Sequence, residues 1–194
     1  MLDVACGTGR HAAWFREAGG RVVGLDLSHQ LLVRARGATT VPLARSDVRW
    51  IPVRPGMMDL TVNLFTSFGY FDDDDEHRRA LTEMLATIRP GGWFVLDFLN
   101  ADQIRRNLVR REEGTVEGRP VTIRRWLDDE GRHVFKQIDV AGRRLLERVR
   151  LFGAAELEAM LSDQGCAVVH RAGDYDGAPL SPDAPRVLLA GRVP

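Results

Sequence analysis

Three aspartates lie in, end or follow three short apolar runs near the start of the chain, in a pattern suited to a nucleoside. Asp3 lies in the first run, Asp26 ends the second and Asp47 follows the third. If these runs are parallel strands of an open α/β sheet, their carboxyl ends meet in one crevice. There Asp26 can accept both ribose hydroxyls, and Asp47 can accept an adenine amino group while Val48 packs on the ring. Asp3 suits a cationic or amine-bearing group and disfavours a pyrophosphate, so the pattern indicates a nucleoside with a positive tail.

A glycine-rich turn, Ala5-Cys6-Gly7-Thr8-Gly9, separates the first apolar run from a helical segment. A strand, such a turn and a helix together direct backbone N–H groups and a helix N-terminus at a ligand. Gly7, Gly9 and Ala12 also fit the looser form of the dinucleotide fingerprint, with Asp26 placed to hold a ribose. The turn therefore predicts a nucleotide-like ligand, and on this motif alone an NAD-dependent oxidoreductase remains open.

Alternating strands and helices must position these residues. Five apolar runs predict strands, and they are Met1–Val4, Arg21–Leu27, Thr39–Ala44, Asp59–Phe65 and Trp93–Leu99. Helices are predicted between them over Arg10–Ala18, after the N-cap residue Ser28, and over Asp75–Ile88. The alternation predicts a doubly wound α/β domain, in which Pro42 confines the third strand to a sheet edge.

The pattern changes after Asn100. A helix over Ala101–Arg111 leads to three polar, alternating segments, which are Pro120–Leu127, Arg132–Val140 and Arg143–Leu151. We expect one domain over residues 1–194, with a small antiparallel β insertion at residues 112–151 that acts as a lid. A helix over Ala154–Ser162 and strands over Ala167–Arg171 and Arg186–Ala190 complete the domain. The loop between these two strands is too short for a crossover helix, so the last strand should run antiparallel.

The composition is that of an ordinary globular protein, with 44% hydrophobic and 28% charged residues. The 27 basic and 27 acidic residues cancel, which argues against a nucleic-acid or membrane-surface partner held by net charge. No apolar run approaches the roughly 18 residues of a membrane span. Cys6 and Cys166 lack metal-ligand spacing, and Asp72–Glu76 reads as an acidic helix start, so we expect a cytoplasmic protein with no bound metal.

Four motifs in this order and spacing resemble the class I S-adenosylmethionine-dependent methyltransferase family. They are Leu2–Gly9, Val23–Ser28, Ser46–Val48 and Arg89–Gly92. The segment Asn63–Tyr70, the β insertion and the Gly-Asp-Tyr-Asp-Gly loop at 173–177 are similar to a small-molecule branch of that family. The resemblance covers essentially the whole chain. It implies a Rossmann-like, mostly parallel seven-stranded sheet with an antiparallel last strand, and S-adenosyl-L-methionine as the cofactor.

The resemblance also implies a set of cofactor-binding residues around the first strands. They are Asp3, Ala5, Cys6, Gly7, Gly9, Asp26, Leu27, Asp47, Val48, Asn63 and Leu64. Two features depart from the family pattern. Ala5 stands where many members have the first glycine, and Met1 lies inside the first strand, before which the family usually has a helical segment. We expect that this segment is missing and that its loss lowers stability and activity.

The implied mechanism is in-line displacement, since a sulfonium methyl group is already activated for transfer. A base is needed only if the acceptor is a protonated amine or a hydroxyl of high pKa. Tyr70 and Tyr175 are the only tyrosines. Both are expected at the mouth of the site, the opening at the carboxyl ends of the parallel strands, so they are the catalytic candidates. Substrate-lining candidates at the same mouth are Ser67, Asn100, Asp174 and Asp176. Oxygen and nitrogen acceptors are favoured over carbon.

The leading hypothesis is therefore methyl transfer to a small-molecule acceptor. A non-catalytic relative that binds S-adenosylmethionine is one alternative, and an NAD-dependent oxidoreductase, which Asp3 disfavours, is another. Nucleic-acid modification is not expected, because Asn63-Leu64-Phe65-Thr66 lacks the Asn/Asp-Pro-Pro-aromatic turn of those enzymes. We expect a small-molecule substrate and neither a nucleic-acid nor a membrane partner, with a homodimer left open.

Overall fold

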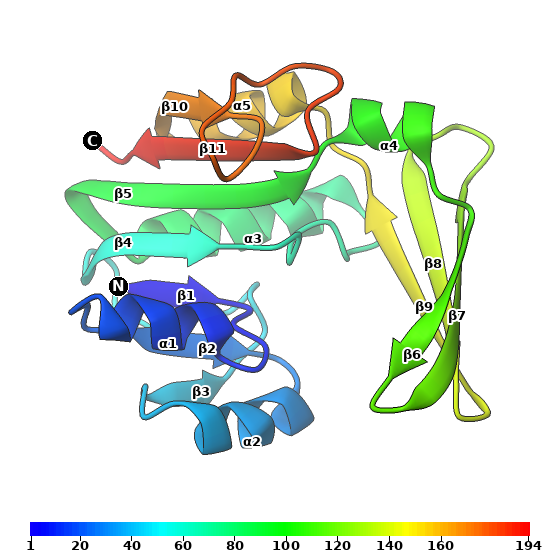
Figure 1. Ribbon diagram of the computed structural model, residues 1–194. Helices are drawn as coiled ribbons and strands as arrows, with labels where there is room; N and C mark the ends of the chain where they lie inside the picture. The colour runs from blue at the N-terminus through cyan, green and yellow to red at the C-terminus, as the bar shows by residue number, and fades with distance from the viewer.

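The computed structural model describes residues 1–194, and its central sheet has seven strands (Figure 1). Their spatial order is β10 (Ala167–Ala172), β11 (Arg186–Arg192), β5 (Ile88–Leu99), β4 (Met58–Asn63), β1 (Leu2–Val4), β2 (Val23–Asp26) and β3 (Leu43–Arg45). The five strands β1 to β5 pair in parallel, and β11 runs antiparallel to both β5 and β10. The predicted mostly parallel sheet with an antiparallel last strand is confirmed, and β3 lies at the edge as predicted, although Pro42 precedes the strand and does not lie within it.

Five helices accompany the sheet, and α1 and α3 lie on its two opposite faces (Figure 1). They are α1 (Arg10–Glu17), α2 (His29–Ala38), α3 (Asp74–Ala86), α4 (Ala101–Asn107) and α5 (Ala154–Ser162). The predicted cap of α2 is present, since Ser28 Oγ accepts from the Leu31 N–H at 3.3 Å. Asp73 caps α3 by accepting from the Glu76 N–H at 2.8 Å. No helix combines the length and the apolar character that crossing a lipid bilayer requires.

Several element boundaries differ from the sequence-based prediction, and strand pairing accounts for two of them. The segment Pro90-Gly91-Gly92 was expected to separate a helix from a strand, but β5 begins before it, at Ile88. The pairing of β4 and β5 shifts register between Met58 and Leu60, so the sheet accommodates this segment as an irregularity. Helix α4 ends at Asn107 rather than Arg111, because the chain from Arg111 onward pairs with another strand.

That strand belongs to the β insertion, a four-stranded antiparallel sheet in the order β6 (Arg111–Val116), β7 (Arg119–Leu127), β8 (His133–Val140) and β9 (Arg143–Arg150). The insertion stands beyond the carboxyl ends of β1, β2, β4 and β5 (Figure 1). Its root is continuous with the main core, where Val134 and Val149 are buried with Phe68 and Phe152. The predicted antiparallel insertion after the fifth strand is confirmed. Strand β6 was not predicted, since its residues are all exposed and carry no apolar alternation.

Candidate cofactor and acceptor site

The glycine-rich turn after β1 has the backbone conformation that its composition predicts. Ala5, Gly7 and Gly9 all have positive φ, at 58°, 57° and 77°. A Cβ added at Gly9 would come within 3.1 Å of a Thr39 methyl group, so the turn packs closely on the end of α2. Around Gly7 no heavy atom lies within 4 Å of such a Cβ, which leaves the backbone open to a ligand. Ala5 holds a left-handed conformation that glycine adopts more easily.

Asp26 connects this turn to the end of β2. Its Oδ2 accepts from the Gly7 N–H and its Oδ1 from the Ser28 N–H, each at 2.8 Å. The side chain is buried, so it fixes the turn whether or not a ligand is bound. Each carboxylate oxygen has a further lone pair, and both can still accept a ribose hydroxyl.

Asp3 differs from Asp26 because one of its oxygens has no partner. The residue is 1% exposed, and Oδ2 makes no hydrogen bond. Burial raises the Asp3 pKa to about 7, the Ala12 N–H opposes this rise, and the Asp26 charge adds to it. A buried carboxyl group with an unsatisfied oxygen is a favourable place for a positively charged group.

Asp47 is engaged by its neighbour Arg49. Its Oδ1 accepts from the Arg49 N–H at 2.9 Å and from Nε at 3.0 Å, and its Oδ2 accepts from Nη2 at 2.6 Å. The hydrogen bonds from the Arg49 side chain hold the pKa of Asp47 below its ordinary value. Arg49 also pairs with Glu76 of α3 and lies over the rings of Trp50 and Phe71. Asp47 thus fixes the loop after β3, and only its remaining lone pairs are free for an adenine.

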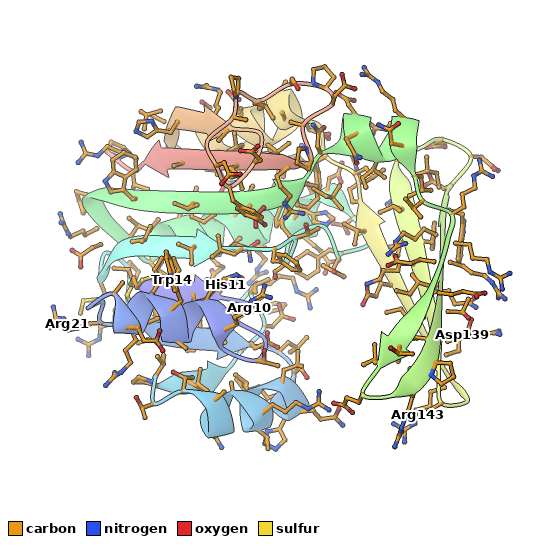
Figure 2. The ribbon with its side chains drawn as sticks, viewed as in Figure 1. Arg10, His11, Trp14, Arg21, Asp139 and Arg143 are labelled. Carbon is orange, nitrogen blue, oxygen red and sulfur yellow. The ribbon has the colours of Figure 1, made fainter.

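A cavity of about 290 Å³ joins the turn to the exit of β4. It is lined by Ala5, Cys6, Gly7, Thr8, Arg10, His11, Leu64, Phe65 and Ser67. Arg10 and His11 come from the first turn of α1 (Figure 2). Asn63 ends β4 beside this cavity, donating from Nδ2 to the Val4 carbonyl at 3.2 Å while its buried Oδ1 has no partner. Four of the predicted cofactor residues, Ala5, Cys6, Gly7 and Leu64, therefore share one cavity.

The two tyrosines have different surroundings. Tyr175 is 65% exposed, and its hydroxyl donates to Asp97 Oδ2 at 2.8 Å. Tyr70 is 49% exposed and lies near Glu147 of β9, where burial and then the Glu147 charge raise the pKa of the phenol. Tyr175 is thus tied to the central sheet, and Tyr70 lies where that sheet meets the β insertion.

The other acceptor-side candidates differ in how free their polar atoms are. Ser67 lines the cavity, although its hydroxyl donates to the Leu64 carbonyl at 2.8 Å. Asn100 is buried, caps α4 through the Asp102 N–H, and donates to the Ser181 and Ala184 carbonyls at 2.9 and 2.8 Å. Its polar groups are therefore used within the fold. Asp174 closes its own loop by accepting from the N–H groups of Asp176 and Ala178, and Asp176 is exposed.

Two buried groups near the mouth were missed by sequence reasoning. Asp97 on β5 accepts from Phe65, Tyr175 and Arg186, and its only sequence signal is an acid near the end of an apolar strand. His77 on α3 accepts from the Phe71 N–H at 3.2 Å and is surrounded by the rings of Phe68, Phe71 and Phe152. The partners of Asp97, and the Phe152 ring against His77, lie in distant segments of the chain, so local patterns do not reveal them.

Comparison with known proteins identifies the class of protein to which this chain is similar. Residues 1–92 match a family model described as a methyltransferase domain. A dTDP-3-amino-3,4,6-trideoxy-alpha-D-glucopyranose N,N-dimethyltransferase of Streptomyces venezuelae is 30% identical, over 91% of this chain and 79% of that protein. A dTDP-4-amino-2,3,4,6-tetradeoxy-D-glucose N,N-dimethyltransferase of Saccharopolyspora spinosa is 28% identical, over 91% of this chain and 75% of that protein.

Solved structures share the fold over the whole chain. An S-adenosylmethionine-dependent methyltransferase from Clostridium acetobutylicum superposes with a TM-score of 0.87 at 17% identity, covering 99% of this chain and 82% of that one. The amino pentose methyltransferase CalS10 from Micromonospora echinaspora, solved with S-adenosylmethionine bound, gives a TM-score of 0.72 at 25% identity with the same coverage.

The chain therefore belongs to the class I S-adenosylmethionine-dependent methyltransferase family, as its motifs predicted. It is an enzyme whose cofactor is S-adenosylmethionine and whose acceptor is a small molecule, which confirms the leading hypothesis over the oxidoreductase alternative. The residues present fit this cofactor. The buried Asp3 has an oxygen free to face a cationic group, and the backbone at Gly7 is open to close approach.

Proposed function

We propose that this enzyme transfers methyl groups to the amine nitrogen of a sugar carried on a nucleotide. The observation that carries the proposal is the match, over nine-tenths of the chain, to two N,N-dimethyltransferases named for dTDP-linked amino sugars. A match of this extent includes the β insertion and β10, which lie outside the 1–92 methyltransferase core. Similarity across these parts supports a shared class of acceptor, because they surround the mouth where an acceptor must enter.

We assign the cofactor side to residues of the first three strands and their turns. Asp26 accepts the ribose hydroxyls beside Leu27, and Asp47 with Val48 holds the adenine. Asp3 and the backbone of the glycine-rich turn hold the methionine end of the molecule. When bound, S-adenosylmethionine supplies a methyl group activated by its sulfonium, so these residues have mainly to align it and exclude water.

We assign the acceptor side to the mouth at the carboxyl ends of the parallel strands. The β insertion, residues 112–151, is assigned as a lid over that mouth. Tyr70, Tyr175 and Ser67 are the groups proposed to contact the acceptor. The lid role is supported by cross-strand register. Val134 and Val149 pack on the main core, and the residues two and four positions further along each strand share their sheet face. That face continues with the ion pair of Lys136 and Glu147 and then with Ile138 opposite Leu145, so beyond its buried root it presents both charged and apolar side chains.

The cellular location that we propose is the cytoplasm. Both cysteines, Cys6 and Cys166, are buried and free, and burial raises the pKa of each thiol. Unpaired, unreactive thiols are in keeping with a reducing compartment.

Two measurements test the proposed function. Calorimetric titration should show binding of S-adenosylhomocysteine and none of NAD. Radiolabelled methyl transfer should then be measured to dTDP-3-amino-3,4,6-trideoxyglucose, to the matching sugar with a hydroxyl in place of the amine, and to glycine. We expect transfer to the amino sugar alone. Transfer to the hydroxyl sugar or to glycine in preference to the amino sugar contradicts the proposal.

A further inference from the structure

Four separate segments meet at the carboxylate of Asp97, which is 2% exposed on β5. Its Oδ2 accepts from the Phe65 N–H at 2.9 Å and from the Tyr175 hydroxyl at 2.8 Å. Its Oδ1 accepts from Arg186 Nε at 2.8 Å and from Nη2 at 2.6 Å. Arg186 lies two residues from Leu188, the direct partner of Asp97 across the sheet, so the two side chains share one face. The carboxylate therefore joins β5, β11, the β4 exit and the 173–177 loop.

The β4 exit is held in a conformation that its residues rarely adopt. Phe65 and Thr66 have φ of 59° and 62°, in the left-handed region that favours glycine. Besides the bond to Phe65, the Asp97 carbonyl accepts from the Thr66 N–H, and Arg186 donates to the Thr66 hydroxyl, both at 3.0 Å. These bonds keep the Phe65 ring at the cavity, 59% exposed, with Arg10 and Arg186 over it. Strained backbone held by its surroundings is characteristic of functional sites.

The Tyr175 hydroxyl is given a fixed direction by the same carboxylate. A carboxylate oxygen only accepts, so the single phenolic proton is directed at Asp97. The lone pairs of the Tyr175 oxygen remain for a ligand, on a side chain that is largely exposed. Burial and then the hydrogen bond to Asp97 raise the pKa of this phenol, so it keeps its proton near neutral pH. A neutral phenol whose proton is already used can only accept from a ligand.

We propose that Asp97 is a positioning residue that fixes Tyr175 as a hydrogen-bond acceptor for an N–H of the amine to be methylated. This inference rests on the proposed function. An amine that donates one N–H to Tyr175 Oη leaves its nitrogen lone pair free to face the methyl donor. Asp97 acts through Tyr175 and Phe65 and does not itself touch the acceptor.

The first test needs no substrate, because Tyr175 and Tyr70 are the only tyrosines. In the Tyr70→Phe background, a tyrosine labelled with ¹³C at Cζ reports the ionisation of Tyr175 alone. We expect the pKa of Tyr175 to lie above 10 and to fall towards 10 in Asp97→Asn. The Asn side chain has a single acceptor oxygen, so it cannot accept from all the groups that now donate to the carboxylate. Equal values in the two proteins contradict a hydrogen bond from Tyr175 to Asp97 in solution.

The second test measures binding of the dTDP-linked amino sugar to protein saturated with S-adenosylhomocysteine, together with kcat and KM for methyl transfer. Tyr175→Phe and Asp97→Asn should each weaken sugar binding about tenfold, the loss expected for one hydrogen bond. The double variant should bind no more weakly than either single variant. Asp59→Asn is the matched control, because it removes the charge of an exposed ion pair with Arg89 at the far end of β4 and should change nothing.

The outcomes separate the inference from the proposed function. Additive losses in the double variant, or equal losses of S-adenosylhomocysteine affinity, overturn the positioning role and indicate a general effect on the fold. If Asp97→Asn does not fold, Tyr175→Phe decides alone, since it removes one exposed hydroxyl, and unchanged amine binding overturns the inference. If the wild type binds no amino sugar, the proposed function and the amine-facing role of Tyr175 both fail, while the titration still decides whether Asp97 holds the phenol.

Discussion

The Gly7 N–H donates to Asp26 Oδ2 at 2.8 Å, so a side chain at the end of one strand sets the turn at the end of its neighbour. The other oxygen of Asp26 holds the Ser28 N–H and so the entry to α2. One carboxylate thus fixes both backbone segments that border the proposed ribose position. Binding and folding are linked at this residue, because the same oxygens are needed for both.

Asp26→Asn should reduce both stability and cofactor affinity. An amide offers one oxygen to two backbone donors, and its NH₂ group then faces the other donor. We expect the free energy of unfolding to fall by about 1–3 kcal/mol and S-adenosylhomocysteine to bind more than tenfold more weakly. Urea denaturation and calorimetry measure the two effects.

The control for this variant is Asp139→Asn in the insertion. Like Asp26, Asp139 accepts hydrogen bonds from two donors, which here are the side chains of Gln137 and Arg144. It lies far from the glycine-rich turn (Figure 2). Its substitution should leave S-adenosylhomocysteine affinity unchanged. Wild-type affinity in Asp26→Asn contradicts the ribose assignment.

Asp3→Asn should make the ligand-free protein more stable at alkaline pH and not at acid pH. The folded pKa of Asp3 is raised from 3.8 to about 7, so the folded state binds this proton more tightly than the unfolded state. The stability that the folded state gains from binding this proton is fully present below about pH 4 and is lost as the pH rises through 7. The gain of the variant at pH 8 should be about 2–4 kcal/mol, measured by urea denaturation at both pH values. The same variant should bind S-adenosylmethionine poorly. A gain independent of pH contradicts the assignment of a buried, proton-binding carboxyl group.

The arrangement of the proposed cofactor residues was predictable because its determinants are local in sequence. Asp3, Gly7, Gly9 and Asp26 lie within one strand-turn-helix-strand unit, and the short spacing fixes which strand ends meet. Parallel pairing of β1 with β2 then follows from the crossover helix. The antiparallel last strand was predictable because the loop before it is too short for a crossover helix.

The acceptor half was predictable only in outline. Asp97 and Arg186 are 89 residues apart, and their contact depends on the register of an antiparallel pair that no local pattern sets. The pairing of Asp47 with Arg49 was hidden for another reason. A carboxylate at a strand end suits either a ligand or a neighbouring guanidinium, and only the backbone of the loop decides between them.

His77→Phe should loosen the loop that carries Tyr70 and should remove part of the acid sensitivity. His77 is buried and neutral, with its pKa lowered mainly by burial, and its Nε2 accepts from the Phe71 N–H. The unfolded state therefore binds this proton more readily, so stability falls as the pH drops below about 6.5. The variant leaves the Phe71 N–H without an acceptor, which should cost about 1–3 kcal/mol at pH 8 and less at pH 5.

Chemical denaturation at pH 8 and pH 5 measures the effect of His77→Phe. His170→Phe is the control, since that side chain is exposed and stacks on Trp93. An equal loss of stability at both pH values contradicts a neutral, proton-excluding role for His77.

Leu145 and Leu146 test the lid directly, because they are neighbours of the same type on opposite faces of β9. Leu145 pairs with Ile138 on the face that packs on the main core at Val149, whereas Leu146 pairs with Gln137 on the other face. Their exposures are similar, at 54% and 60%, so replacing either by Ser should change stability equally little. If the insertion covers the acceptor, Leu145→Ser should raise the KM for the amino sugar about three- to tenfold, as expected when apolar contact area is lost. Leu146→Ser should leave that KM unchanged, and both variants should bind S-adenosylhomocysteine as the wild type does. Equal KM values in the two variants contradict the proposed lid role, because they mean that the Leu145 face of the insertion does not contact the acceptor.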